Sequence, residues 1–248
     1  MKGKYIAGLA LIVLGSLAGF KGAVDGNQSM INAGIGGVFL GILILTFSPS
    51  NNVKYDAFKS IVLPYIESYR RLSEALGLKG KAVYIPPHDN LPKGGVFIPL
   101  YEDFEIDLSR FDENTVFVTD VGKAKEMGLL LPPLGEDLMR MYEEYSEMDF
   151  AGAGISVVEN SSAVLKSLGL VKSISVEERD DKINIYLEGV RVGFCSESCE
   201  QVACPVCNSL LLTAAKSLQE LVLVEKFRFE DRFVVISFRR LGGIDKWT

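Results

Sequence analysis

Two long apolar stretches open the chain, and a short polar loop separates them. Residues 5–20 carry no charged side chain, and residues 30–47 are almost wholly apolar or small. A helix needs roughly 20 apolar residues to cross the hydrocarbon core of a bilayer, and both stretches reach that length with their flanks. A cleaved signal peptide is the alternative interpretation of the first stretch. The second stretch favours a transmembrane helical hairpin over residues 1–50, with residues 5–47 in contact with lipid.

Glycines recur four residues apart in both apolar stretches, as Gly15 and Gly19 and again as Gly37 and Gly41. In lipid, such small residues let two helix backbones approach closely. The pattern predicts that the two helices pack on each other, and pairing between subunits is the alternative. Neither stretch has an ionisable residue in its middle, so we expect an anchor and not a transporter.

Lysines lie on the outer flanks of the hairpin. Lys2 and Lys4 precede the first helix, and Lys54 and Lys59 follow the second, whereas the loop balances Lys21 with an aspartate. Positive charge collects on the cytoplasmic side of membrane proteins. The pattern therefore predicts a protein of the cell membrane with both termini, and the domain that follows, in the cytoplasm.

The rest of the chain, residues 51–248, alternates between helical and strand-like periods. A breaker run at 48–52 ends the second apolar helix. The order of elements predicts an α+β fold class, a cytosolic domain with a mostly antiparallel sheet and packed helices. Helices are expected at 53–76 (with a kink or a second start at Pro64), at 134–148, from Ser161 or Ser162 to Gly169, and at 207–220. Strands are expected at 81–85, 96–100, 115–119, 171–178, 182–188, 222–229 and 232–239.

Composition narrows the possible partners. The 248 residues carry a net charge of −6, and the first 50 residues contribute three lysines and one aspartate, which leaves −8 for the remainder. A nucleic-acid partner is not expected, because phosphate binding needs a basic surface. The lipid bilayer, a protein partner near the membrane or a second copy of the chain remain.

All four cysteines lie in one thirteen-residue segment, as Cys195, Cys199, Cys204 and Cys207. Four thiolates suit a tetrahedral zinc ion, and the sequence predicts a metal site with these ligands, with zinc as the cofactor. An iron–sulfur cluster also takes four thiolates. Two disulfides are a further alternative, although cytosolic disulfides are rare outside hyperthermophiles. Free, inert thiols complete the alternatives.

Catalytic thiols are another alternative, carried by Cys204-Pro205-Val206-Cys207 at the start of a predicted helix. Backbone amides at a helix N-terminus stabilise a thiolate and lower its pKa. This Cys-Pro-x-Cys string resembles the active-site motif of glutaredoxins. The resemblance covers these four residues, and the order of the surrounding strands does not repeat a thioredoxin-like domain.

A wider resemblance involves two strings of residues. Leu-Leu-Leu-Pro-Pro-Leu-Gly-Glu-Asp-Leu spans 129–138, and Cys-Pro-Val-Cys-Asn-Ser spans 204–209. With the two preceding apolar stretches, the chain resembles a group of uncharacterised archaeal membrane-anchored proteins. The resemblance implies an archaeal source and a Cys-Pro-x-Cys element in the domain, and it implies no activity.

Common catalytic motifs are missing from the sequence. There is no G-x-x-x-x-G-K-[ST] phosphate loop and no G-x-S-x-G elbow, and His88 is the one histidine. The sequence assigns no catalytic residue and does not favour an enzyme. It predicts a membrane-anchored scaffold or recognition protein with a structural four-cysteine site. The alternative is a membrane-tethered thiol–disulfide or iron–sulfur redox protein that uses the same cysteines.

Overall fold

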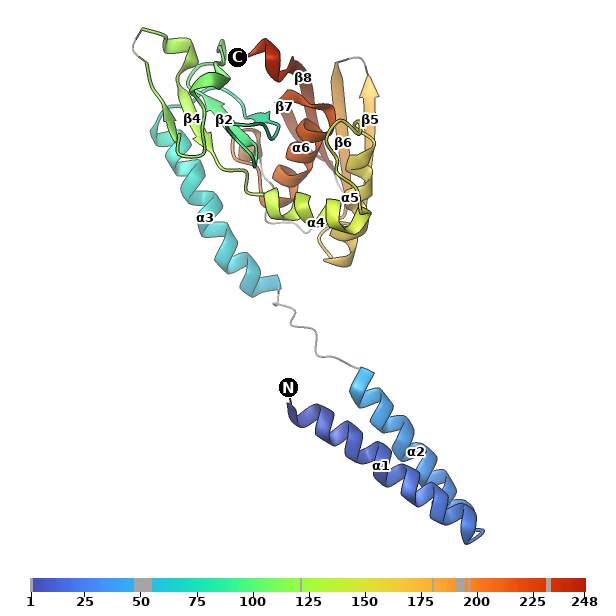
Figure 1. The fold of residues 1–248 in the computed structure, drawn as a ribbon. Helices are drawn as coiled ribbons and strands as arrows, with labels where there is room; N and C mark the ends of the chain where they lie inside the picture. Colours follow the sequence, from blue (N-terminus) through green and yellow to red (C-terminus); the bar gives the residue numbers. More distant parts are fainter. Residues whose placement is uncertain are drawn as a thin grey trace. The chain divides into compact units, whose positions relative to one another are not determined.

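The computed structural model describes residues 2–46, 55–120, 122–179, 181–190, 195, 197–230 and 233–248 (Figure 1). The chain divides into two compact units, Met1–Lys54 and Tyr55–Thr248. We call them the hairpin unit and the larger unit. The break expected at 48–52, and the turn positions 180 and 231 of two expected strand hairpins, lie outside the described residues.

The hairpin unit consists of α1 (Lys2–Val24) and α2 (Gln28–Thr46), which lie side by side in Figure 1. Both helices are long and apolar enough to cross a bilayer, by length and composition. Their backbones approach closely at glycines: a Cβ atom on Gly34 would lie 2.4 Å from the amide nitrogen of Gly19. The prediction that the two helices pack on each other through glycines is confirmed.

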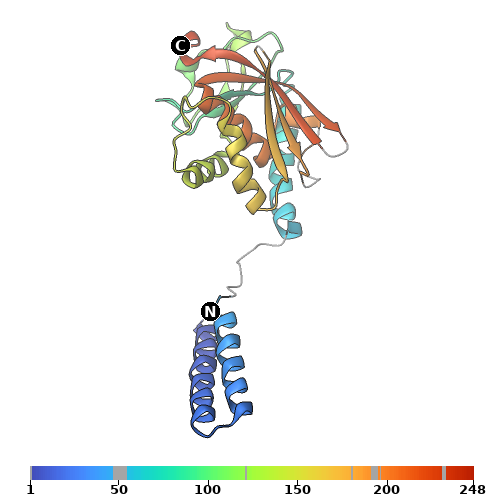
Figure 2. The same ribbon diagram turned by 90° about the vertical axis from the view of Figure 1, so that its right-hand side faces the viewer.

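The larger unit is built on one eight-stranded sheet in which every pairing is antiparallel, in the order β3-β4-β2-β1-β7-β8-β6-β5. Helices and an antiparallel sheet make this an α+β unit, as the order of elements predicts. Figure 2 shows the long β7–β8 hairpin crossing it. The strands are β1 (Val83–Ile85), β2 (Gly95–Pro99), β3 (Phe117–Val118), β4 (Gly128–Leu131), β5 (Ser173–Arg179), β6 (Lys182–Glu188), β7 (Glu220–Glu230) and β8 (Phe233–Gly243).

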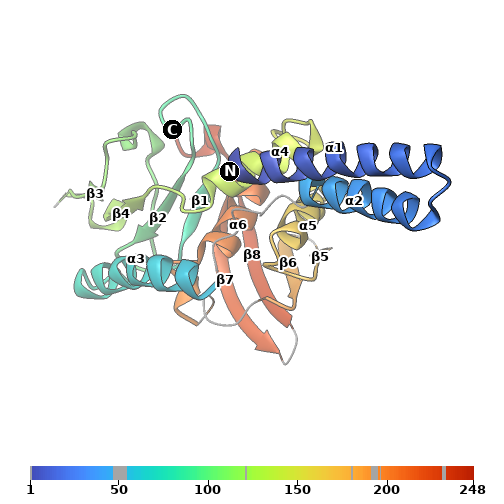
Figure 3. The ribbon, with the colours of Figure 1, turned by 90° about the horizontal axis from the view of Figure 1, so that it is seen from below.

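Helices cover one face of the sheet, and irregular chain covers much of the other (Figure 3). Side chains alternate between the faces along each strand. Tyr84 of β1 therefore faces the core on the helical side, whereas its neighbours Val83 and Ile85 face a second core under loop 104–111 and the C-terminal residues. The helices are α3 (Tyr55–Ala75), α4 (Glu136–Ser146), α5 (Val157–Ser167) and α6 (Pro205–Leu218), with short 3-10 turns η1 (Leu108–Arg110), η2 (Ala124–Glu126), η3 (Glu197–Glu200) and η4 (Ile244–Lys246).

Three expectations about elements need correction. Residues 128–131 form strand β4, although the sequence analysis placed no strand before Pro132. Helix α5 starts at Val157, so Ser161 lies inside it and its hydroxyl donates to the carbonyl of Val158. Of the two outcomes expected at Pro64, a kink or a second start, the second start is absent, because helix α3 runs through that residue.

Candidate metal centre

The cysteines reach one place from both sides of a short loop. Cys204 is the N-cap of α6, Pro205 fills the first helical position where an amide donor is not needed, and Cys207 follows in the first turn. Cys199 lies in the 3-10 turn η3, and Cys195 precedes that turn. Among the described residues no disulfide joins them.

Three sulfur atoms lie close enough to share one ion. The Sγ atom of Cys195 is 3.3 Å from the Sγ atom of Cys204 and 3.3 Å from that of Cys207, and all three lie within 4.8 Å of one another. Zinc–sulfur bonds of about 2.3 Å in a tetrahedron put the sulfurs roughly 3.8 Å apart. These three cysteines could therefore hold a metal ion with a small outward adjustment.

Cys199 lies near this group of three, and hydrogen bonding with its thiol contributes to the pKa shifts of Cys195 and Cys204. The side chains of Cys199, Cys204 and Cys207 are wholly buried, and that of Cys195 is half-buried. The structure thus brings together three of the four residues that the sequence predicted as ligands, Cys195, Cys204 and Cys207, with Cys199 nearby. We call these four residues the cysteine pocket. It lies in the core of the larger unit, and Cys195 is its half-buried member.

The thiols share protons unequally. Hydrogen bonds from Cys195, Cys199 and Cys207 hold the pKa of Cys204 well below the usual range of a thiol. Hydrogen bonds to the other three cysteines, followed by burial, raise the pKa of Cys195. The cluster therefore concentrates negative charge on the residue at the helix N-terminus. A metal ion that bound here would displace the remaining protons.

Polar contacts anchor the loop that carries the cysteines. The Gln201 amide donates to the carbonyl oxygens of Leu78 and Gly80 at 2.9 Å each, and it accepts from the Ser73 hydroxyl of α3 at 2.8 Å. The carbonyl of Glu200 accepts from the amide of Ala82 at 2.9 Å. The loop is therefore fixed to α3 and to the segment that leads into β1.

The two strings that carry the family resemblance meet beside the cysteines. The amide of Gly135 donates to Asn208 Oδ1 at 3.1 Å. A Cβ atom on Gly135 would lie 2.2 Å from the amide nitrogen of Ser209, so this position needs glycine. The Tyr142 hydroxyl lies 2.7 Å from the Ser209 hydroxyl. The start of α4 is therefore packed against the first turn of α6, where two of the cysteines lie.

Sequence reasoning missed two residues of this pocket. Arg70 of α3 donates from Nη2 to the Cys199 sulfur at 3.4 Å. The hydroxyl of Tyr84 is fully buried and has no hydrogen-bond partner of good geometry among the described residues, although Asn208 is near. Burial, and then the electrostatic effect of the neighbouring cysteines, Cys207 first, raise the pKa of Tyr84. A signal for Arg70 exists, because it shares a helix face with the buried Ile66 and Ser73.

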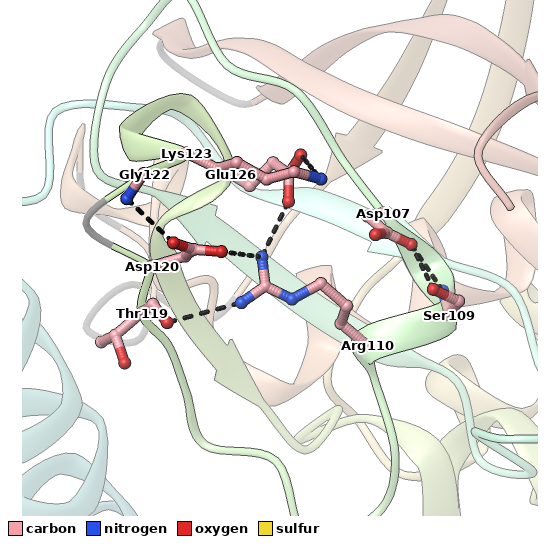
Figure 4. Close-up of polar contacts among 8 residues, drawn as sticks. All are labelled: Asp107, Ser109, Arg110, Thr119, Asp120, Gly122, Lys123 and Glu126. Carbon is pink, nitrogen blue, oxygen red and sulfur yellow. Dashed lines mark hydrogen bonds and ion pairs between the residues drawn. The ribbon is translucent and has the colours of Figure 1, made fainter.

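A second polar cluster lies beside β3 and β4, at one edge of the sheet, and its charged groups are paired with one another (Figure 4). Glu126 is nearly buried and binds Arg110 at 2.7 Å and Lys123 at 2.8 Å. Arg110 also approaches Asp120 at 3.8 Å and donates to the carbonyl of Thr119. Each charge has an opposite partner, so the network ties the loop together.

His88 also lies away from the cysteine pocket. Its Nδ1 atom is 3.1 Å from the carbonyl oxygen of Pro86, in the loop between β1 and β2. None of its hydrogen bonds within the described part of the chain joins it to a carboxylate or to a nucleophile. The one histidine therefore takes no part in a triad that the described residues form.

Comparison with known proteins gives a family and no activity. The model of a family described as a domain of unknown function, DUF7982, matches residues 4–239. The match covers both units and all four cysteines, so the chain belongs to this family. No curated protein and no solved structure matches the chain.

Proposed function

For this member of a family without an assigned activity, we propose a membrane-anchored scaffold or recognition protein. In this proposal, zinc bound by Cys195, Cys199, Cys204 and Cys207 stabilises the larger unit. The observation that carries it is the complete burial of three of the four thiols in the core, where Cys195 lies 3.3 Å from two of them, Cys204 and Cys207. Structural zinc sites use four protein ligands and leave no open position for a substrate.

A structural role fits the surroundings of the sulfurs. The cysteine loop contacts α3, the entry to β1 and β7, and the first turn of α6 contacts the start of α4. A metal ion here would bond the cysteine loop to the first turn of α6, and these two segments are the ones that contact α3, β1, β7 and α4. The free energy of binding would then contribute directly to folding.

A redox role is the second candidate. Cys204 begins a helix, and its pKa is held low, as in reactive thiols. Thiol–disulfide exchange, however, requires a partner sulfur to reach the thiolate, and the Cys204 side chain is 0% exposed. An iron–sulfur cluster places several irons between its ligands, whereas sulfurs 3.3 Å apart suit a single ion. Both observations favour zinc.

The hairpin unit supports the proposal of a membrane anchor. Its two helices pass the length and composition test for a membrane span, and no charged residue lies within either span apart from Lys21 near the end of the first. We propose that the hairpin holds the larger unit at the cytoplasmic side of the cell membrane. The archaeal source stays a prediction of the resemblance.

The test is metal content with thiol counting on the full chain, purified in detergent without oxygen. We expect about one zinc per chain, with four thiols that react with a thiol reagent only after denaturation. Iron with acid-labile sulfide would overturn the proposal in favour of electron transfer. Metal-free protein would also overturn it, in favour of thiol chemistry if the thiols react at once and of two disulfides if none reacts.

A further inference from the structure

Arg70 brings a positive charge from α3 to the cysteine pocket. Its Nη2 atom donates to the Sγ atom of Cys199 at 3.4 Å, across 129 positions of sequence. Its Nε atom is buried and has no partner within the described part of the chain. The guanidinium group is thus partly removed from water, and Cys199 supplies its hydrogen bond there.

The positive charge of the Arg70 guanidinium group favours a negatively charged partner at the Cys199 sulfur atom. A buried charge costs free energy unless an opposite charge or a strong acceptor compensates it. A neutral thiol is a weak acceptor, whereas a thiolate supplies a full negative charge. A cysteine that binds a metal ion does so as a thiolate, so Arg70 would be well paired with Cys199 in the metal-bound state.

Helix α3 makes a second contact with the cysteine loop, through Ser73. The Ser73 hydroxyl donates to Gln201 at 2.8 Å, so α3 meets the cysteine loop at two points. Of these two contacts, the one that Arg70 makes reaches a sulfur atom. A substitution of Ser73 therefore tests the packing of α3 on the loop, whereas a substitution of Arg70 also tests the contact with the Cys199 sulfur atom.

We propose that Arg70 is a positioning residue for the metal centre, and that its guanidinium group holds the Cys199 thiolate in the ligand set. The inference rests on the proposed zinc site and adds an outer partner to it. Zinc with four thiolates carries a net charge of −2, and Arg70 offsets part of this charge in the core. Outer partners of metal ligands typically contribute about 10–100-fold to metal affinity.

A consequence follows for α3. If Arg70 pairs best with the metal-bound thiolate, zinc binding and docking of the second half of α3 stabilise each other. The helix begins at Tyr55, nine residues after the last described residue of α2. The metal centre would then fix the helix that follows the anchor in the chain.

The experiment measures zinc affinity of the full chain in detergent by competition with a coloured chelator. Arg70→Gln is expected to weaken zinc binding about 10–100-fold, with one zinc per chain still bound at saturation. Two matched controls are Ser73→Ala, which removes the other contact of α3 with the loop, and Arg71→Gln, whose side chain is 78% exposed. Both controls are expected to stay within about threefold of wild type.

Unchanged affinity in Arg70→Gln, or an equal loss in Ser73→Ala, would overturn the role of Arg70 and leave the zinc site standing. A wild-type chain that binds no zinc would instead overturn the site itself, and the inference with it. If Arg70→Gln does not fold, Arg70→Lys is compared with Arg71→Lys. Lysine lacks the planar fork of arginine, so Arg70→Lys should bind zinc more weakly than Arg71→Lys, and equal affinities would overturn the inference.

Discussion

Gly34 is the residue at which the two helices of the hairpin unit come closest. A Cβ atom there would lie 2.4 Å from the amide nitrogen of Gly19 and 2.7 Å from the carbonyl oxygen of Gly15. Backbone cannot move aside as a flexible side chain does. We expect Gly34→Ala to push the helices apart and to destabilise the hairpin by about 1–3 kcal/mol.

The measurement for Gly34→Ala is the distance between spin labels on α1 and α2 in detergent, combined with thermal unfolding of the full chain. Gly36→Ala is the matched control, because a Cβ atom on Gly36 meets nothing within 4 Å inside the hairpin. Equal behaviour of the two variants would contradict the glycine contact. A change of oligomeric state in Gly36→Ala alone would favour pairing between subunits.

Gly135 is the corresponding position beside the cysteine pocket. A Cβ atom on this residue would lie 2.2 Å from the amide nitrogen of Ser209, in the first turn of α6. We expect Gly135→Ala to displace α4 from α6 and to destabilise the larger unit by about 1–3 kcal/mol or more. The control is Gly243→Ala, whose added Cβ atom would come no nearer than 3.8 Å to a neighbour. The measurement is denaturant unfolding of both variants. Equal unfolding midpoints would contradict the close approach of Gly135 to Ser209.

Residue by residue, the site was predictable only where its members are near in sequence. The four cysteines lie within thirteen positions, so their spacing alone predicts that they meet. Arg70 reaches Cys199 across 129 positions of sequence, and Tyr84 lies in β1, also far from the cysteines in the sequence. Such contacts depend on the order of strands and helices in space, which no local pattern contains.

At the scale of elements, periodicity predicted those with one solvent-facing side best. Strand β6 alternates buried and less buried positions along Lys182–Glu188, and its predicted bounds are those of the structure. Strand β4 is buried at all four positions and reads as a short apolar run before Pro132. It was missed because a strand covered on both faces shows no alternation.

The ion-pair network around Glu126, next to β4, predicts how the stability of the larger unit depends on pH. A hydrogen bond from Lys123 is the largest cause that lowers the pKa of Glu126 from its usual 4.5, and Arg110 adds to it against the effect of burial. The unfolded chain therefore binds this proton more readily than the folded chain. The contribution of Glu126 to stability is present above about pH 4.5 and is lost as the pH falls through the lowered value.

The measurement is the unfolding free energy of the full chain between about pH 3 and pH 7. Glu126→Gln is expected to be less stable than wild type at pH 7, and the difference should shrink toward the acid end. The exposed Glu113→Gln serves as the control. A difference between wild type and Glu126→Gln that stays constant over the whole pH range would contradict the ionic role of Glu126.

At the scale of the whole molecule, the joining of strands into one sheet escaped sequence analysis. Val83 of β1 pairs with Leu223 of β7, so strands from the first and last thirds of the larger unit are neighbours. The predicted hairpins 171–188 and 222–239 are both present, and β6 pairs with β8 to join them. Long-range pairings of this kind leave no trace in a local window, whereas the hairpins do.

The orientation of the chain in the membrane joins the anchor to the chemistry of the cysteines. Lys2, Lys4, Lys54 and Lys59 flank the hairpin on one side, against a loop in which Lys21 and Asp25 cancel. We therefore predict that a C-terminal epitope after Thr248 is protected from protease in intact cells stripped of their wall and is cleaved after lysis. An epitope inserted after Gly26 is the control and should be cleaved in the intact cells.

The same measurement bears on the zinc site, because the two sides of the membrane differ in redox state. Cytoplasmic reductants keep thiols reduced, and reduced thiols are what a metal centre requires. An accessible C-terminal epitope would place Cys195–Cys207 in an oxidising compartment, where sulfurs already 3.3 Å apart would be expected to pair as disulfides. Protection of the epitope together with bound zinc would support both a cytoplasmic larger unit and a zinc site in it. Accessibility with bound zinc would require another means of keeping the four thiols reduced.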